Sequence, residues 1–166
     1  MMCSANEVMT LAAKAARGAG APPAQATDFG IAALRHLQAG RDVQNLNDAL
    51  TLLPDGPVLQ LPLALLQMIE NAAGDSATGG FGQAARSDLA LSYLDAQPYE
   101  TKVETVDGKV QVTLFLAQAK GAPVTSRVRL PDTLAATFLR YAARLLVPES
   151  EASRLLGAGA GLTDND

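Results

Sequence analysis

The residues of this chain that could form a binding site lie in two stretches, one early in the sequence and one at its end. The candidates are Arg17, His36, Ser150, Ser153, Arg154, Asp164 and Asp166. Arginine and serine side chains donate hydrogen bonds to carboxylates and phosphates, so this set predicts a site for a small anionic ligand. No catalytic role is assigned to any of these residues, and no cofactor is expected.

The two aspartates near the C-terminus have two possible roles. Carboxylate oxygens are ligands that Mg²⁺ or Ca²⁺ accepts. Asp164 and Asp166 could instead pair with Arg17 or Arg154 and hold the end of the chain against the rest of the protein. The metal interpretation is the less favoured one, and we expect no metal site.

The single histidine and the single cysteine exclude several kinds of site. A zinc site made of Cys or His ligands cannot be built within one chain, and Cys3 cannot form an intramolecular disulfide. The sequence contains neither a nucleophile elbow nor a phosphate-binding loop motif. His36 follows apolar residues at helical spacing, so a half-buried histidine bonded to a neighbour is favoured over a catalytic base.

Composition and charge limit the possible partners. The net charge is −4 and no run of Lys or Arg is present, so binding to nucleic acid is not expected. The first residues lack the features of a signal peptide, and the apolar runs are too short to span a membrane. These observations predict a soluble cytoplasmic protein. Alanine is abundant and Trp is absent, so burial against a second copy would help, and a homo-oligomer is expected.

The first half of the sequence predicts helices. Ser4 and Glu7 have the spacing of a capping box, and the helix that they begin is expected to end at Gly18. Three more helices are predicted by apolar periodicity and by proline and glycine at their ends. They run from Pro22 to Gly40, from about Asp42 to the PDGP segment at 54–57, and from about Pro62 to Gly74.

The middle of the chain predicts an antiparallel sheet. Residues 74–83 are rich in glycine and are expected to form a flexible loop, which could alternatively wrap an anion. Residues 88–94 are predicted to form a strand. Asp107 and Gly108 are the preferred pair for a two-residue hairpin turn. Closing the turn there pairs Val103 with Val112, and residues 124–130 are expected to continue the meander.

Together these elements predict an α+β fold with a single domain over 1–166. The expected parts are helices at 1–74, an antiparallel sheet at 86–131, C-terminal helices at 132–156 and a glycine-rich tail at 157–166. The tail has a composition typical of a frayed terminus, but the serines and the arginine before it are also consistent with a docked segment. The residues leave both alternatives open.

Two segments also resemble a known family. NEVMTLAAKAARGAGAP (Asn6 to Pro22) and LVPESEASRLLGAGAGLTDND (Leu146 to Asp166) are similar to the ends of a family of bacterial proteins of unknown function. In that family both ends carry such patterns and the middle varies. The resemblance covers roughly the first forty and the last thirty residues. It implies a bacterial source and favours a docked C-terminal segment, and it supplies no activity.

Two functions are consistent with this sequence. The first is a non-catalytic accessory protein that binds a small molecule or a partner enzyme. The alternative is a lyase or isomerase that uses carboxylates and arginine on a small acidic metabolite. Its base would be a buried acid, because burial raises the pKa of a carboxyl group toward neutrality. The candidates for that base are Asp28, Asp88, Asp95 and Glu100.

Overall fold

The computed structural model describes residues 1–81, 87–107, 109–121 and 127–146, which form an α+β fold. The helices are α1 (Ala5–Ala19), α2 (Pro23–Gln38), α3 (Gln44–Thr51), α4 (Pro57–Glu70), α5 (Asp88–Asp95) and α6 (Asp132–Ala142). The strands are β1 (Met2–Cys3), β2 (Ser76–Gly79), β3 (Tyr99–Val106), β4 (Lys109–Ala119) and β5 (Val128–Arg129). A short 3-10 helix, Ala143–Leu145, follows α6. This is the predicted fold class.

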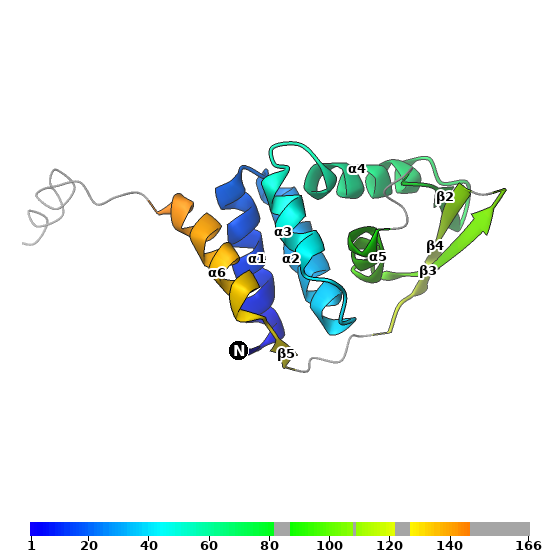
Figure 1. Cartoon of the computed structure of the whole chain (residues 1–166). Helices are drawn as coiled ribbons and strands as arrows, with labels where there is room; N and C mark the ends of the chain where they lie inside the picture. The colour runs from blue at the N-terminus through cyan, green and yellow to red at the C-terminus, as the bar shows by residue number, and fades with distance from the viewer. Residues whose placement is uncertain (82–86, 108, 122–126, 147–166) are drawn as a thin grey trace, which may run out of the picture.

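The helices α6, α1, α2 and α3 form a bundle, and α4 and α5 lie between this bundle and the larger sheet (Figure 1). One cluster of buried apolar side chains extends through the bundle, α4, α5 and the sheet. Its largest members include Phe29, Phe138, Tyr93 and Leu46. The core therefore joins the helical part to the sheet, which fixes α5 between them.

Small residues let α1 pack closely on both sides. A Cβ on Gly18 would overlap the carbonyl oxygen of Tyr141 on α6, and a Cβ on Gly30 of α2 would lie 2.6 Å from the Met9 carbonyl oxygen. The predicted capping box at Ser4 and Glu7 is present. The helix ends later than predicted, because Gly18 is needed for packing and Gly20, with φ 111°, forms the left-handed cap.

The start of α4 also differs from the prediction. The helix begins at Pro57 and not at Pro62, which lies inside it. Proline is favoured in the first turn of a helix, where its missing amide hydrogen costs nothing. Pro57 uses that preference, whereas Pro62 removes one hydrogen bond from the interior of the helix. The helix ends at Glu70.

The hairpin has the predicted register. Val103 pairs with Val112, Thr105 pairs with Val110, and Glu104 pairs with Gln111. Val112 and Leu114 of β4 are fully buried, as the alternation of apolar residues predicts, whereas Val103 of β3 is 42% exposed. The second neighbour of β4 is β2, which gives the strand order β2-β4-β3. The prediction of a flexible loop at 74–83 is thus wrong for Ser76–Gly79, which form this edge strand.

Two predicted strands need correction. Residues 88–94 form the helix α5, because Ser87 caps the backbone N–H of Ala90 and Leu89 and Tyr93 share one buried face. Residues 128–129 form a strand, but it pairs with β1 and not with the meander. Cys3 lies opposite Val128 in that small sheet. The start of the chain is therefore tied to the segment that leads into α6.

Candidate functional site

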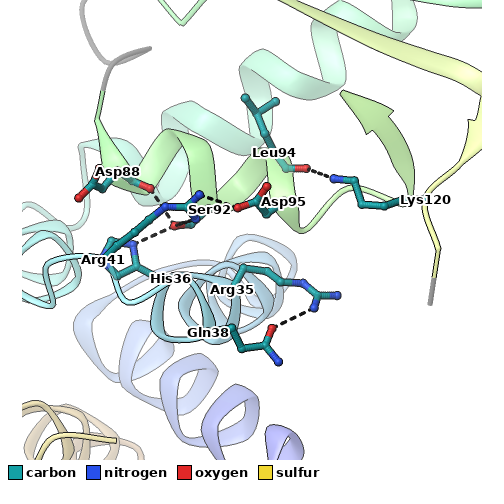
Figure 2. A network of polar contacts seen from close by, with 9 residues as sticks. All are labelled: Arg35, His36, Gln38, Arg41, Asp88, Ser92, Leu94, Asp95 and Lys120. Atoms are coloured by element: carbon teal, nitrogen blue, oxygen red, sulfur yellow. Dashed lines mark hydrogen bonds and ion pairs between the residues drawn. The ribbon is translucent and has the colours of Figure 1, made fainter. Parts of the chain in front are cut away.

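A buried polar network joins the end of α2 to α5 (Figure 2). The His36 Nδ1 atom lies 2.8 Å from the Ser92 hydroxyl, and its Nε2 atom lies 2.7 Å from the Asp42 carbonyl oxygen. Both His36 and Ser92 are fully buried. A carbonyl oxygen can only accept, so Nε2 carries the proton and Nδ1 accepts from Ser92 in the neutral ring. The Ser92 hydroxyl also lies 2.8 Å from the Asp88 carbonyl oxygen, an alternative acceptor for its single proton.

The network extends to the protein surface through an ion pair. Arg41 donates one hydrogen bond to the Ser92 hydroxyl over 2.9 Å and another to the Asp95 carboxylate over 2.6 Å. Burial lowers the pKa of His36 below its usual value, more than the hydrogen bond to Asp42 raises it. The ring is therefore mostly neutral at pH 7, and Arg41 and Asp95 form the ion pair of this network.

This network is closed to a substrate. A serine beside a neutral histidine has the composition of a nucleophile and its base. However, no part of either side chain contacts solvent, and each polar atom of the pair is already hydrogen-bonded. The arrangement holds α5 against α2. At the C-terminal end of α5, Lys120 donates to the Leu94 carbonyl oxygen over 3.1 Å and ties the helix to the end of β4 (Figure 2).

An open cavity lies beside the same two helices. Its volume is about 180 Å³, and α2, α4, α5 and the residues just after α5 form its walls. The lining residues are Asp28, Ile31, Pro62, Leu65, Leu66, Ile69, Tyr93, Ala96 and Gln97. Most of this lining is apolar, with a few polar groups among it, which is the usual composition of a small-molecule site. Leu66 is 51% exposed, so the cavity opens to solvent along α4.

The hydroxyl of Tyr93 is the unusual group in this cavity. Tyr93 is only 1% exposed, and its hydroxyl oxygen has no hydrogen-bond partner among the described residues. Burial raises the pKa of Tyr93, and the nearby charge of Asp28 raises it further, so the phenol keeps its proton. A buried hydroxyl without a partner costs roughly 1–3 kcal/mol, so most such groups in native proteins are paired.

Asp28 is the charged group of the cavity. It keeps contact with solvent, but partial burial raises the pKa of its carboxyl group above the usual value. The carboxylate is thus incompletely solvated and has no ion pair among the described residues. Gln97 is the remaining polar side chain, and its amide nitrogen donates to the Tyr93 carbonyl oxygen over 3.2 Å. This leaves the amide oxygen of Gln97 as an acceptor.

The structure separates the predicted site residues. Arg17 is exposed in the last turn of α1, whereas His36 is buried in the network. Five other predicted site residues lie outside the described part of the chain: Ser150, Ser153, Arg154, Asp164 and Asp166. The predicted short helix after Pro148 and the glycine-rich tail also lie outside it. The anion site expected from these residues therefore stays a prediction.

The four acids proposed as a base have different environments. Asp95 pairs with Arg41, Asp88 is half-buried in the first turn of α5, and both Glu100 and Asp28 are exposed. Only Asp28 of the four lines the cavity. Neither Tyr93 nor Gln97 is among the site residues predicted from the sequence. A helix at 88–94 would have placed Tyr93, four residues after Leu89, on the same face as Leu89.

Other features of the described residues bear on function only weakly. Within 1–81, 87–107, 109–121 and 127–146, no group of three or more His, Cys, Asp or Glu could hold a metal ion. The described helices also include none that is long and apolar enough to cross a membrane.

Comparison with protein-family models, curated proteins and solved structures gave no match to this chain. The resemblance of its two end segments to a bacterial family stays a prediction. Function must therefore be argued from the cavity and the polar groups that line it.

Proposed function

We propose that this protein is a non-catalytic binding protein that holds a small, largely apolar molecule in the cavity formed by α2, α4 and α5. The observation that carries the proposal is the buried Tyr93 hydroxyl, which has no partner among the described residues and belongs to a residue that lines the cavity. Buried polar groups are normally paired, so an unpaired one beside an open cavity indicates where a polar group of a ligand binds.

The size of the cavity limits the ligand. A cavity of about 150 Å³ lined by apolar side chains is large enough for benzene. The volume of about 180 Å³ therefore suits a body of similar size with one polar group attached. Ile31, Leu65 and Ile69 supply apolar contacts for that body, whereas Tyr93 and Asp28 supply polar contacts.

A thermal-shift experiment tests this proposal. Wild-type protein is heated with a panel of small aromatic and branched aliphatic molecules that includes acids, bases and neutral compounds. At least one class is expected to raise Tm in a concentration-dependent way, because a ligand that binds only the folded state stabilises it. A panel without any effect at millimolar concentration would contradict the proposal.

Two variants locate the effect. Ala96→Leu adds a side chain to the lining of the cavity and is expected to abolish the ligand-dependent rise in Tm. Ala24→Leu makes the same change at an exposed position of α2 and is expected to preserve it. Equal shifts in the two variants would place the ligand elsewhere on the protein.

One observation favours a second candidate function. Asp28 combines a raised pKa with a position beside a buried phenol, which is how a carboxylate that acts as a general base is placed. An enzyme of the lyase or isomerase type would consume a ligand that binds the cavity. Nuclear magnetic resonance of the ligand over time separates the candidates: slow conversion that Asp28→Asn abolishes would support the enzyme, and an unchanged ligand supports the binding protein.

The expected homo-oligomer belongs to this proposal as well. Leu139, Leu145 and Leu146 are exposed on and just after α6, with Leu146 75% exposed, and they would be covered by a second copy. Light scattering after size-exclusion chromatography tests this, and a monomer at high concentration would contradict it. The cytoplasmic location and the absence of nucleic-acid partners stay predictions from the sequence.

A further inference from the structure

We infer that the cavity formed by α2, α4 and α5 binds an organic ammonium ion, with the apolar body of the ligand against α4 and its charged nitrogen between Asp28 and Tyr93. This inference rests on the proposed binding function and specifies the chemical class of the ligand. It is carried by three features of the lining: its charge, the hydrogen-bonding capacity of its polar groups, and its volume.

The charge of the lining favours a cation. Asp28 is the one charged side chain among the described residues that line the cavity, and no arginine, lysine or histidine is among them. A carboxylate ligand would bring a second negative charge next to Asp28, which like-charge repulsion disfavours. An ammonium ion would give the exposed Asp28 carboxylate a counter-ion, which it lacks among the described residues.

The hydrogen-bonding groups include several acceptors for a donor on the ligand. Ionised Asp28 offers acceptor oxygens only, and the Gln97 amide, which donates one N–H to the Tyr93 carbonyl oxygen, keeps its own oxygen as an acceptor beside a second N–H. The Tyr93 hydroxyl can donate its proton, and its oxygen can accept as well. A primary ammonium carries three N–H donors, so one group of the ligand can reach Asp28 and also satisfy the buried Tyr93 oxygen. Such hydrogen bonds are strengthened by charge.

The apolar lining selects the body. Leu65, Ile69 and Ile31 present hydrocarbon to a cavity of about 180 Å³, close to the roughly 150 Å³ that accommodates benzene. A ring or a branched chain of about five to seven carbons therefore fills it. Polyamines and ammonium itself lack this body and are expected to bind weakly.

The ionisation of Asp28 links binding to pH. Partial burial raises the pKa of the free carboxyl group, and a bound cation favours its charged form. Affinity for the amine should therefore rise as the pH increases through the raised pKa of Asp28 and then become constant. A neutral ligand of the same shape should show no such rise.

The test compares matched ligands on the full-length chain by calorimetric titration at pH 7. One series is benzylamine, benzyl alcohol and benzoate, and the other is 3-methylbutylamine, 3-methylbutanol and 3-methylbutanoate. In at least one series the amine is expected to bind about tenfold or more tightly than the alcohol, and the acid is expected not to bind. Alcohol binding equal to amine binding, or preferred binding of the acid, would overturn the ammonium assignment and leave the cavity proposal intact. No binding by any of the six compounds would overturn both.

Two variants test whether Asp28 contacts the ligand ammonium. Asp28→Asn is expected to reduce the affinity for the amine about tenfold while the affinity for the alcohol stays the same. Asp55→Asn makes the same substitution at an exposed acid outside the cavity and is expected to have no effect. Amine binding that Asp28→Asn leaves unchanged would refute the inference. If that variant does not fold, backbone chemical shifts of the wild type decide: the amine must perturb α2, α4 and α5, and perturbations confined to other elements would refute it.

Discussion

Two polar clusters lie on α2 and α5, and they differ in whether their hydroxyl groups have hydrogen-bond partners. The His36 network between α2 and α5 is closed, and its central hydroxyl, that of Ser92, contacts three partners. The cavity beside these helices is open, and the hydroxyl of the next residue, Tyr93, has no partner in the described chain. Adjacent residues on α5 therefore differ in how their hydroxyls are satisfied. The paired hydroxyl of Ser92 fixes the helix, and we propose that the unpaired hydroxyl of Tyr93 gains its partner when a ligand binds.

The largest expected effect comes from breaking the closed cluster. Ser92→Ala removes a partner from His36 Nδ1 and from Arg41, and both groups stay buried or partly buried. We expect the free energy of unfolding to fall by about 1–3 kcal/mol, measured by urea denaturation. Ser76→Ala in β2 is the matched control and should change it by under about 0.5 kcal/mol. Equal losses in both variants would contradict the role of the network.

Acid should weaken the same cluster. Burial lowers the pKa of His36 in the folded protein, so below about pH 6.5 the unfolded chain binds a proton that the native protein does not. Stability is therefore complete above that pH and decreases as the pH falls toward the lowered pKa. Denaturation at a series of pH values measures the slope. His36→Gln should flatten it, and an unchanged slope in that variant would assign the loss to other groups.

The next largest effect comes from replacing aspartate by asparagine at one acid of each cluster, Asp95 and Asp28, and the two changes in stability should have opposite signs. Asp95→Asn weakens the ion pair with Arg41 and should lower stability by about 1 kcal/mol or less. Asp28→Asn should have the opposite sign at pH 7 in the absence of ligand. The raised pKa of Asp28 means that its ionised form is less favourable in the folded state than in the unfolded state. Thermal denaturation of both variants is the measurement, and destabilisation by Asp28→Asn would contradict the description of the cavity.

The smallest expected change in stability, that of Tyr93→Phe, is the most direct test of the difference between the two hydroxyls. Tyr93→Phe removes a hydroxyl that has no partner in the described chain, so the ligand-free protein should be unchanged or slightly stabilised, within about 0.5 kcal/mol. Ser92→Ala removes one oxygen from the adjacent residue with a much larger cost. If urea denaturation gave Tyr93→Phe a loss as large as that of Ser92→Ala, the phenol would have an internal partner and the cavity would lose its main support.

The sequence predicted local features of the fold well and long-range ones poorly. The hairpin register could be predicted because a turn signal and an alternating pattern agree on it, and pairing Val103 with Val112 keeps the apolar residues of both strands on one face. Residues 88–94 were ambiguous, since Leu89, Leu91 and Tyr93 fit a strand as well as a helix. The cap at Ser87 favours the helix locally. Nothing local predicts that β5 pairs with β1, because that contact joins distant parts of the chain.

The candidate site was predictable only in part. The sequence identifies Asp28 as one of four possible acids and provides no means of choosing, because burial depends on packing between α2, α4 and α5. Tyr93 gave no signal, since an aromatic residue in an apolar pattern usually belongs to the core. Its hydroxyl became notable only when its hydrogen-bond partners could be counted. The predicted residues at the C-terminal end lie outside the described chain and stay untested.

Pro62 has a consequence for how the cavity could exchange its contents. Proline in the interior of α4 removes a backbone hydrogen bond, so the helix lacks one restraint where Pro62 lines the cavity. The opposite wall belongs to α2 and α5, which the His36 network locks together. Uptake and release of a guest would then depend on the bending of one helix against a fixed frame, and residence time would be set by α4, independently of the groups that determine affinity.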